Sequence, residues 1–220
     1  MINRLEISNF KSVLKADLQF GRVNLFIGPN GAGKSNVLEA IGILSASLGR
    51  SINKTDLDLR GVRLSLPRLF KATFKNRDIP STFRLKASIG NAVYQPTISA
   101  GDLSSELTFL SESISENGEK IVGRSHNGVR IHRPLVEGVD AQKIVTGESG
   151  LWPSIGQFCD VSFATIDLLA DVGRYAIYTP QTALMRGLAT DPRDGLIEPL
   201  GLTGGNLAKA LGSLLQSANT

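Results

Sequence analysis

The chain has little of several residue types on which small proteins often depend. Its 220 residues include one cysteine, two histidines and one tryptophan. A single cysteine cannot form an internal disulfide, and the first residues lack the charged, apolar and small-residue order of a secretory signal. No apolar run approaches the roughly 20 residues that span a bilayer. These absences exclude a disulfide-built domain and membrane insertion, and we expect a cytoplasmic protein.

Composition and charge fit an ordinary globular domain. Hydrophobic residues make up 41% of the chain and charged residues 20%, which is enough to bury a core. The excess of 24 Lys and Arg over 20 Asp and Glu leaves a net charge of +4. This mild basic excess is compatible with a nucleic-acid partner but does not indicate one by itself. We expect a single domain over residues 1–220.

The first 50 residues alternate in a way that predicts strand, glycine loop and helix. Alternating apolar residues predict strands around Leu5–Ile7 and Leu18–Phe20, and the nearly continuous apolar run Val23–Ile27 predicts a third, buried strand. Glycines interrupt the pattern over Gly28–Gly33. Apolar residues then recur at helical spacing over Ser35–Leu48, before Gly49.

The later pattern predicts an antiparallel sheet followed by helices. Three β-rich stretches cover residues 69–74, 82–89 and 92–99, and hairpin pieces follow within residues 117–133. A helix is expected to end near Gly173, a short strand to cover residues 176–180, and an amphipathic helix to close the chain over Asn206–Leu215. The fold class is therefore α/β.

The string GPNGAGKS, Gly28 to Ser35, carries the chemistry. It matches the spacing G-x-x-x-x-G-K-[ST] of a phosphate-binding loop, between an expected strand and an expected helix. Lys34 is placed to reach the β- and γ-phosphates of ATP, and the Ser35 hydroxyl can ligate Mg²⁺. A plain glycine turn is the alternative, which the strand and helix on either side disfavour. The expected ATP-binding residues are Asn30, Gly31, Ala32, Gly33, Lys34, Ser35 and Asn36.

The extended strings LEISNFKSV and FIGPNGAGKSNVLEAI resemble the ABC-type P-loop ATPase heads of the RecF, SMC and OLD families. LDLRGV and GGNLAKAL look like recurring phrases of OLD-like AAA-family ATPases. The resemblance implies a P-loop NTPase lobe with an antiparallel β-subdomain beside the P-loop sheet. It also implies that two heads sandwich ATP, so that binding drives engagement and hydrolysis releases it. The implied work is on DNA, as in repair, or in phage defence.

The Walker B Asp–Glu pair that such heads need for hydrolysis is not found. Val161–Asp167 is the nearest imitation, but Leu168 replaces the glutamate and the segment looks helical. Leu202–Asn206, LTGGN, resembles an ABC signature, whereas OLD-like proteins carry a similar phrase at the end of their first lobe. We favour this first-lobe interpretation. The chain then resembles the N-terminal portion of a longer ATPase that binds ATP with little or no turnover alone.

The resemblance also assigns roles to residues outside the loop. Gln181 follows an expected strand where ABC-type heads keep a glutamine that senses Mg²⁺ and the attacking water. Lys11 lies where related heads often carry a basic residue near the nucleotide, although an exposed turn lysine is an equal alternative.

The expected partners are a second ATPase head or a complementary C-terminal lobe. DNA is a further candidate, because a basic stretch could follow its backbone, although solvated strand faces explain that stretch as well. Its members are Arg60, Arg63, Arg68, Lys71, Lys75 and Arg77. A different class of function also stays open, in which the chain is a nucleotide-binding regulatory or assembly module that does not hydrolyse ATP.

Overall fold

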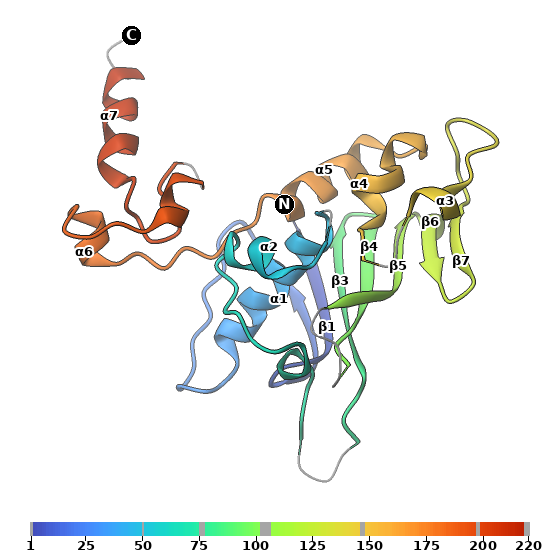
Figure 1. Ribbon diagram of the computed structural model, residues 1–220, viewed down its shortest axis with the longest axis horizontal. Helices are drawn as coiled ribbons and strands as arrows, with labels where there is room; N and C mark the ends of the chain where they lie inside the picture. Colours follow the sequence, from blue (N-terminus) through green and yellow to red (C-terminus); the bar gives the residue numbers. More distant parts are fainter. Residues whose placement is uncertain are drawn as a thin grey trace.

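The computed structural model describes residues 2–49, 51–74, 78–101, 107–145, 148–196 and 199–217. Its centre is a seven-stranded antiparallel sheet with the order β2-β1-β3-β4-β5-β6-β7 (Figure 1). The strands are β1 (Arg4–Phe10), β2 (Val13–Gln19), β3 (Thr82–Ile89), β4 (Ala92–Ser99), β5 (Thr108–Glu116), β6 (Glu119–Ser125) and β7 (Gly128–Ile131). The α/β fold class and the antiparallel sheet are confirmed.

Helices lie between β2 and β3 and after β7 in the sequence. The longer ones are α1 (Lys34–Ser47), α5 (Phe163–Gly173) and α7 (Leu207–Ser217). Shorter helical segments are α2 (Lys54–Asp58), η1 (Pro67–Phe70), α3 (Ala141–Ile144), α4 (Leu151–Ile155), η2 (Gly156–Phe158), α6 (Thr182–Met185) and η3 (Pro192–Gly195). Within the described ranges, no helix is long and apolar enough to cross a membrane.

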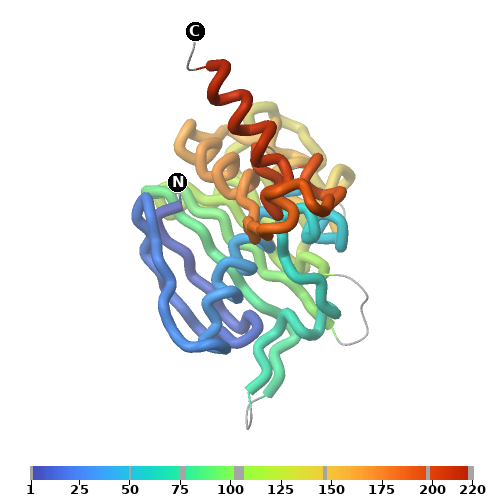
Figure 2. The backbone as a smooth tube through the Cα atoms, turned by 90° about the vertical axis from the view of Figure 1, so that its left-hand side faces the viewer, coloured from blue at the N-terminus to red at the C-terminus, as the bar shows by residue number. Residues whose placement is uncertain are grey.

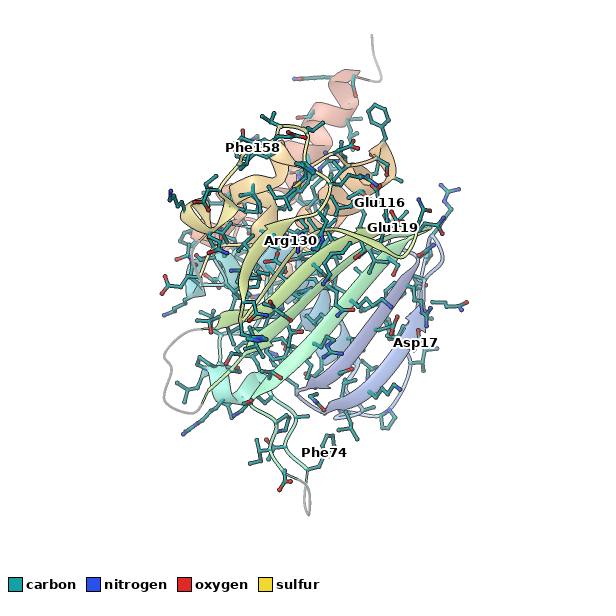
Figure 3. All side chains as sticks on the ribbon, turned by 90° about the vertical axis from the view of Figure 1, so that its right-hand side faces the viewer. Asp17, Phe74, Glu116, Glu119, Arg130 and Phe158 are labelled. Carbon is teal, nitrogen blue, oxygen red and sulfur yellow. The ribbon has the colours of Figure 1, made fainter. Side chains whose placement is uncertain are left out.

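One face of the sheet is covered by helices and the other is open. Leu5 and Ile7 of β1 point to the covered face, whereas Arg4 and Glu6 alternate with them on the open face, as the two-residue period of a strand requires. Arg4 donates to Asp17 of β2 at 2.7 Å on that open face. The side of the sheet without helices faces the viewer in Figure 3.

Helices α1 and α5 cover the other face. Ile43 and Leu44 of α1 and Leu168 of α5 are fully buried against the sheet. The Ser45 hydroxyl joins the two helices, because it donates to the carbonyl oxygen of Gly173 at 2.9 Å. Figure 2 shows α1 lying across the strands. This packing holds the helix that follows the glycine loop at a defined position on the sheet.

A buried polar network attaches the C-terminal end of α1 to the sheet. The Tyr94 hydroxyl on β4 lies 2.8 Å from Ser47 Oγ and 2.8 Å from Glu112 Oε1 on β5. Arg124 of β6 donates to Glu112 Oε2 at 2.6 Å. Burial raises the pKa of Glu112, against the opposing effect of Arg124. Charge pairing and hydrogen bonding therefore satisfy every one of these buried side chains.

Three expected strands are wrong. Val23–Ile27 is not a strand, because no neighbouring strand lies beside it among the described residues, and its alternate side chains are exposed. Residues 69–74 instead finish η1 and then make an isolated bridge at Lys71, since Pro67 begins a helical turn. Residues 176–180 form an irregular connection whose amides bond loop carbonyls, as Ile177 N does with Arg60 O.

The end of the chain stands away from the sheet. Helix α7 projects from the rest of the molecule beyond α6 (Figure 1). Its amphipathic pattern was expected, and the helix is confirmed, but Leu211, Leu214 and Leu215 are exposed. Asp167 lies exposed within α5, so the helical interpretation of Val161–Asp167 is correct.

Candidate functional site

The glycine loop from Gly28 to Gly33 leads directly into α1. Gly31 and Gly33 have φ angles of +82° and +91°, a backbone region that favours glycine. A Cβ on Gly33 would lie 2.9 Å from the Ser12 hydroxyl oxygen of the β1–β2 turn, whereas one on Gly31 would meet no atom within 4 Å. Gly33 therefore lets the loop pack closely against the β1–β2 turn. Gly31 leaves open space beside the loop, which a ligand could enter.

The first turn of α1 offers free hydrogen-bond donors. The N-cap residue Gly33 has no side chain to accept from them, and the first turn contains no acidic residue. Among the described residues, the backbone N–H groups of Lys34 and Ser35 have no acceptor. The partial positive charge at a helix N-terminus favours an anion at such a position. The geometry is that of an anion cradle.

Lys34 lies over this cradle. Its ammonium donates to the carbonyl oxygens of Gly28 at 2.7 Å and Pro29 at 2.8 Å. Both acceptors are neutral, so an incoming phosphate oxygen offers the ammonium a stronger, charge-assisted bond. The role of Lys34 in phosphate binding stays a prediction, and its ammonium lies beside the loop where that role would require it.

Ser35 and Asn36 complete the loop side of the site. The Ser35 hydroxyl is exposed and has no protein partner in the part of the chain that the structure describes, so its oxygen is accessible to a hard cation such as Mg²⁺. Asn36 donates to the Ser12 hydroxyl at 2.7 Å, which ties the helix to the β1–β2 turn. These residues fit an Mg-nucleotide, for which Gly31, Gly33 and Lys34 would hold the phosphate oxygens.

Lys11 also lies next to the loop, but it is not the exposed turn lysine of the alternative. Its ammonium pairs with Glu39 of α1 and lies 4.6 Å from the centre of the Phe70 ring. Sequence analysis missed Glu39. A signal existed, because Glu39 is an acidic residue within the apolar helical run, where an unpaired charge is costly.

The expected basic stretch does not form one exposed tract. Arg60 pairs with Asp56 and donates to Ser45, and Lys71 is buried. Burial lowers the pKa of Arg60. Arg68 is exposed, while Lys75 and Arg77 lie outside the described residues.

The backbone hydrogen bonds of Gln181 join it to α6 and to the loop before α7, not to the P-loop. It precedes α6, where its backbone N–H donates to the Thr203 carbonyl oxygen at 2.9 Å. In the described ranges, its hydrogen bonds do not reach Lys34 or Ser35, and no three acidic, histidine or cysteine side chains cluster as a metal site.

The LTGGN loop before α7 already holds an anion from its own chain. Asp194 accepts hydrogen bonds from the backbone N–H groups of Thr203 at 2.8 Å and Gly205 at 2.9 Å, and from the Thr203 hydroxyl. Burial of this carboxylate opposes ionisation, but these hydrogen bonds outweigh it and lower the pKa of Asp194. A Cβ on Gly201 or Gly205 would overlap the carboxylate. This arrangement favours the first-lobe interpretation, because the donors that would meet a partner's phosphate are occupied.

Comparison with known proteins agrees with the nucleotide-binding geometry. Residues 1–119 match the family described as the AAA ATPase domain. The DNA replication and repair protein RecF of Magnetococcus marinus is 48% identical over 54 residues, which are 24% of this chain and 14% of that protein. RecF of Clostridioides difficile is 39% identical over 70 residues, 31% of this chain and 18% of that protein.

More distant similarities extend to two other groups. The OLD nuclease of Thermus scotoductus is 36% identical over 52 residues, 24% of this chain and 10% of that protein. A solved chain, from work on ATP-driven dimerization and DNA stimulated activation of SMC ATPases, has a TM-score of 0.39 and 21% identity over 54% of this chain and 70% of that chain. The matched part spans less than a fifth of each of the three curated relatives. The family match over residues 1–119 nevertheless covers more than half of the chain, which belongs to the AAA ATPase domain family and resembles the ATPase heads of RecF and OLD proteins.

Proposed function

We propose that this chain binds Mg-ATP at the Gly28–Ser35 loop and works as the nucleotide-binding lobe of an ABC-type ATPase head. The observation that carries the proposal is the open anion cradle at the start of α1, with Lys34 beside it and free N–H donors at Lys34 and Ser35. Family membership supports nucleotide binding, and the cradle supports the Gly28–Ser35 loop as the place where it would occur.

The residues of the cradle would divide the work among them. The backbone N–H groups around Gly31 and Gly33 would bind phosphate oxygens, and Lys34 would neutralise their charge. Ser35 would contribute a hydroxyl oxygen to Mg²⁺, which would bridge two phosphates and reduce their repulsion. Gln181 stays our prediction for sensing Mg²⁺ and the attacking water. Reaching that position would require the segment before α6 to approach the loop.

A complementary lobe is supported by the segment before the loop. Val23, Leu25 and Ile27 are 90%, 81% and 85% exposed, although alternating apolar residues of this kind are normally buried in a sheet. The backbone N–H and C=O groups of this segment make no backbone hydrogen bonds to the described residues. A second lobe that adds strands here would bury these side chains and pair this backbone.

The wider role follows from the head architecture. Head-to-head association controlled by ATP would let the protein act on DNA, as the name of the DNA replication and repair protein RecF suggests for those relatives, or in phage defence. A second, different function is a regulatory module that binds ATP without hydrolysis. The described residues favour it in one respect, because the acidic residue nearest Ser35 on α1, Glu39, is already paired with Lys11 and Arg63.

ATP binding and ATP turnover on the same purified chain test this proposal. We expect Mg²⁺-dependent binding that Lys34→Ala abolishes, with little turnover. Turnover that appears when a C-terminal lobe with a Walker B Asp–Glu pair is joined to the chain would support the ATPase head, and continued absence of turnover would support the regulatory module. Failure of the unaltered chain to bind ATP would overturn both.

A further inference from the structure

Glu39 stands out as a buried carboxylate with two cations from distant parts of the chain. It lies on the P-loop helix α1 and is only 2% exposed. Lys11, from the β1–β2 turn, pairs with Glu39 Oε2, and Arg63 donates from Nε to Glu39 Oε1 at 2.6 Å. A buried acid with one cation would be neutralised, so two cations leave this cluster with a net positive charge.

The two cations differ in what they can still offer a ligand. Lys11 is largely buried over the Phe70 ring, and its backbone has a φ of +47°, which is costly for a residue with a side chain. The Arg63 side chain is 70% exposed and uses only Nε for its ion pair. Both terminal nitrogens of Arg63 therefore keep donors that no described protein group accepts.

These cations border a cavity that adjoins the phosphate-binding loop. The cavity has a volume of about 580 Å³. Its lining combines the polar and basic side chains of Lys11, Ser12, Asn36, Arg63 and Lys71 with the apolar side chains of Leu64 and Leu69. Asn36 and Ser12 line the cavity and also lie next to the loop, because Asn36 follows the loop in sequence and Ser12 lies against Gly33. A nucleotide whose phosphates lie on the loop would therefore have this basic cavity at its side.

We propose that Glu39 is a positioning residue of the nucleotide site, which holds the Arg63 guanidinium at the rim of this cavity so that its free donors contact the bound nucleotide. This inference rests on the proposed ATP binding at the loop. The ion pair through Nε fixes the plane of the guanidinium and lowers the entropy that Arg63 loses on contact with an anion. Lys11 offsets the charge of Glu39, so that Arg63 keeps its full attraction for phosphate.

The test measures Mg-ATP affinity and thermal unfolding for matched variants. Arg63→Ala should weaken ATP binding by about three- to tenfold, the range for one hydrogen bond at a partly exposed site, with the melting temperature little changed. Arg68→Ala removes the same charge five residues further on, outside the cavity, and should change affinity less than about twofold. The inference would be overturned if the Arg63→Ala variant bound ATP with the same affinity as the Arg68→Ala variant.

A double-mutant cycle separates positioning from stability. Glu39→Gln should weaken ATP binding in the wild-type background but add little in the Arg63→Ala background, because Glu39 acts through Arg63. Glu39→Asp, which keeps the charge, should restore part of the affinity. Additive losses, or a lower melting temperature with unchanged affinity, would overturn the positioning role. If Glu39→Gln does not fold, Glu39→Asp replaces it in the same cycle with Arg63→Ala, because its shorter side chain should also misplace the guanidinium.

Lys34→Ala keeps this inference distinct from the proposed function. Loss of binding in Lys34→Ala together with wild-type affinity in Arg63→Ala would leave ATP binding standing and remove the role of Glu39. Wild-type protein that binds no ATP would overturn both statements together.

Discussion

Two glycine-rich loops in this molecule each open a helix, yet they are built for opposite purposes. The loop before α1 leads to N–H donors at Lys34 and Ser35 that no described group accepts, and a Cβ on Gly31 would meet no atom within 4 Å. In the loop before α7, backbone N–H groups donate to the carboxylate of Asp194, and Gly201 and Gly205 lie against that carboxylate. In the first loop glycine leaves open space, where we propose that a ligand binds, and in the second it makes room for a side chain of the same chain.

The second loop holds an anion, the Asp194 carboxylate, and we propose that the first loop also binds one. What differs is the source of the anion. Asp194 lies only nine residues before Thr203, so a short 3₁₀ turn can place its carboxylate inside the second loop. No acidic residue occurs between Asp17 and Glu39, and the first loop is therefore left without an internal anion.

The largest expected effect separates the loops by ligand binding. Lys34→Ala should weaken Mg-ATP binding by about a hundredfold or more, because it removes a charge-assisted contact to the phosphates. Isothermal titration at fixed salt measures this. Lys209→Ala on α7 is the control, since it removes an exposed lysine from the helix that follows the second loop. Equal affinities for Lys34→Ala and Lys209→Ala would show that the first loop is not a phosphate site.

Removal of the internal anion should affect the second loop alone. Asp194→Ala leaves two backbone donors and the Thr203 hydroxyl without their acceptor, which should cost about 2–4 kcal/mol of local stability. Faster proteolysis and hydrogen exchange within residues 199–217 would report it, with ATP affinity unchanged. Asp167→Ala removes an exposed aspartate from α5 and should leave both measurements as they are. A second loop that stays protected without Asp194 would contradict this account.

A pair of glycine substitutions should have smaller effects, on the stability of the second loop in one variant and on ATP binding in the other. Gly205→Ala should destabilise the second loop by about 1–3 kcal/mol, because its Cβ would overlap the Asp194 carboxylate. Gly31→Ala has space for its Cβ but must adopt a φ of +82°, which should cost about 1 kcal/mol and weaken ATP binding. Thermal unfolding and ATP titration on both variants measure this. The same pattern in both variants would remove the distinction between the loops.

The smallest expected effect is a pH dependence confined to the second loop. The folded-state pKa of Asp194 lies below its ordinary value of 3.8, so the unfolded chain binds more protons than the folded chain in that range. The stability contributed by this carboxylate is therefore present above about pH 4 and is lost as pH falls through the folded-state pKa. Hydrogen exchange of residues 201–206 between pH 5 and 3 measures it. Asp194→Asn should abolish this dependence, and an unchanged pH profile in that variant would contradict the assignment.

Local signals in the sequence predicted much of the fold correctly. The alternation in residues 82–89 and 92–99 predicted β3 and β4, because each strand buries one face on its own period. Helix α1 and the loop before it were predicted because turn chemistry and helical spacing are both local. The strand predicted over Val23–Ile27 is wrong, since an apolar run becomes a strand only when a neighbouring strand pairs with its backbone.

The part of the candidate site that lies in one continuous stretch of sequence could be predicted. Lys34 and Ser35 follow from motif spacing, whereas the cations at Glu39 come from residues 28 and 24 positions away and could not be paired from sequence. The role of Gln181 stays a prediction. The charge of the basic stretch was visible in the sequence, but its ion pairs were not, because they depend on which acids the fold brings near.

The amino-acid sequence by itself determined that a glycine loop with the spacing typical of phosphate binding leads into a helix, and which strand residues face the core. Those features rest on backbone conformations and periodicities that involve neighbours within a few residues. Only the tertiary structure decided that the loop before α7 is filled by Asp194, that Glu39 pairs with Lys11 and Arg63, and that Val23–Ile27 stands exposed. The physical reason is that burial and charge pairing depend on which distant groups meet, and that is decided by packing.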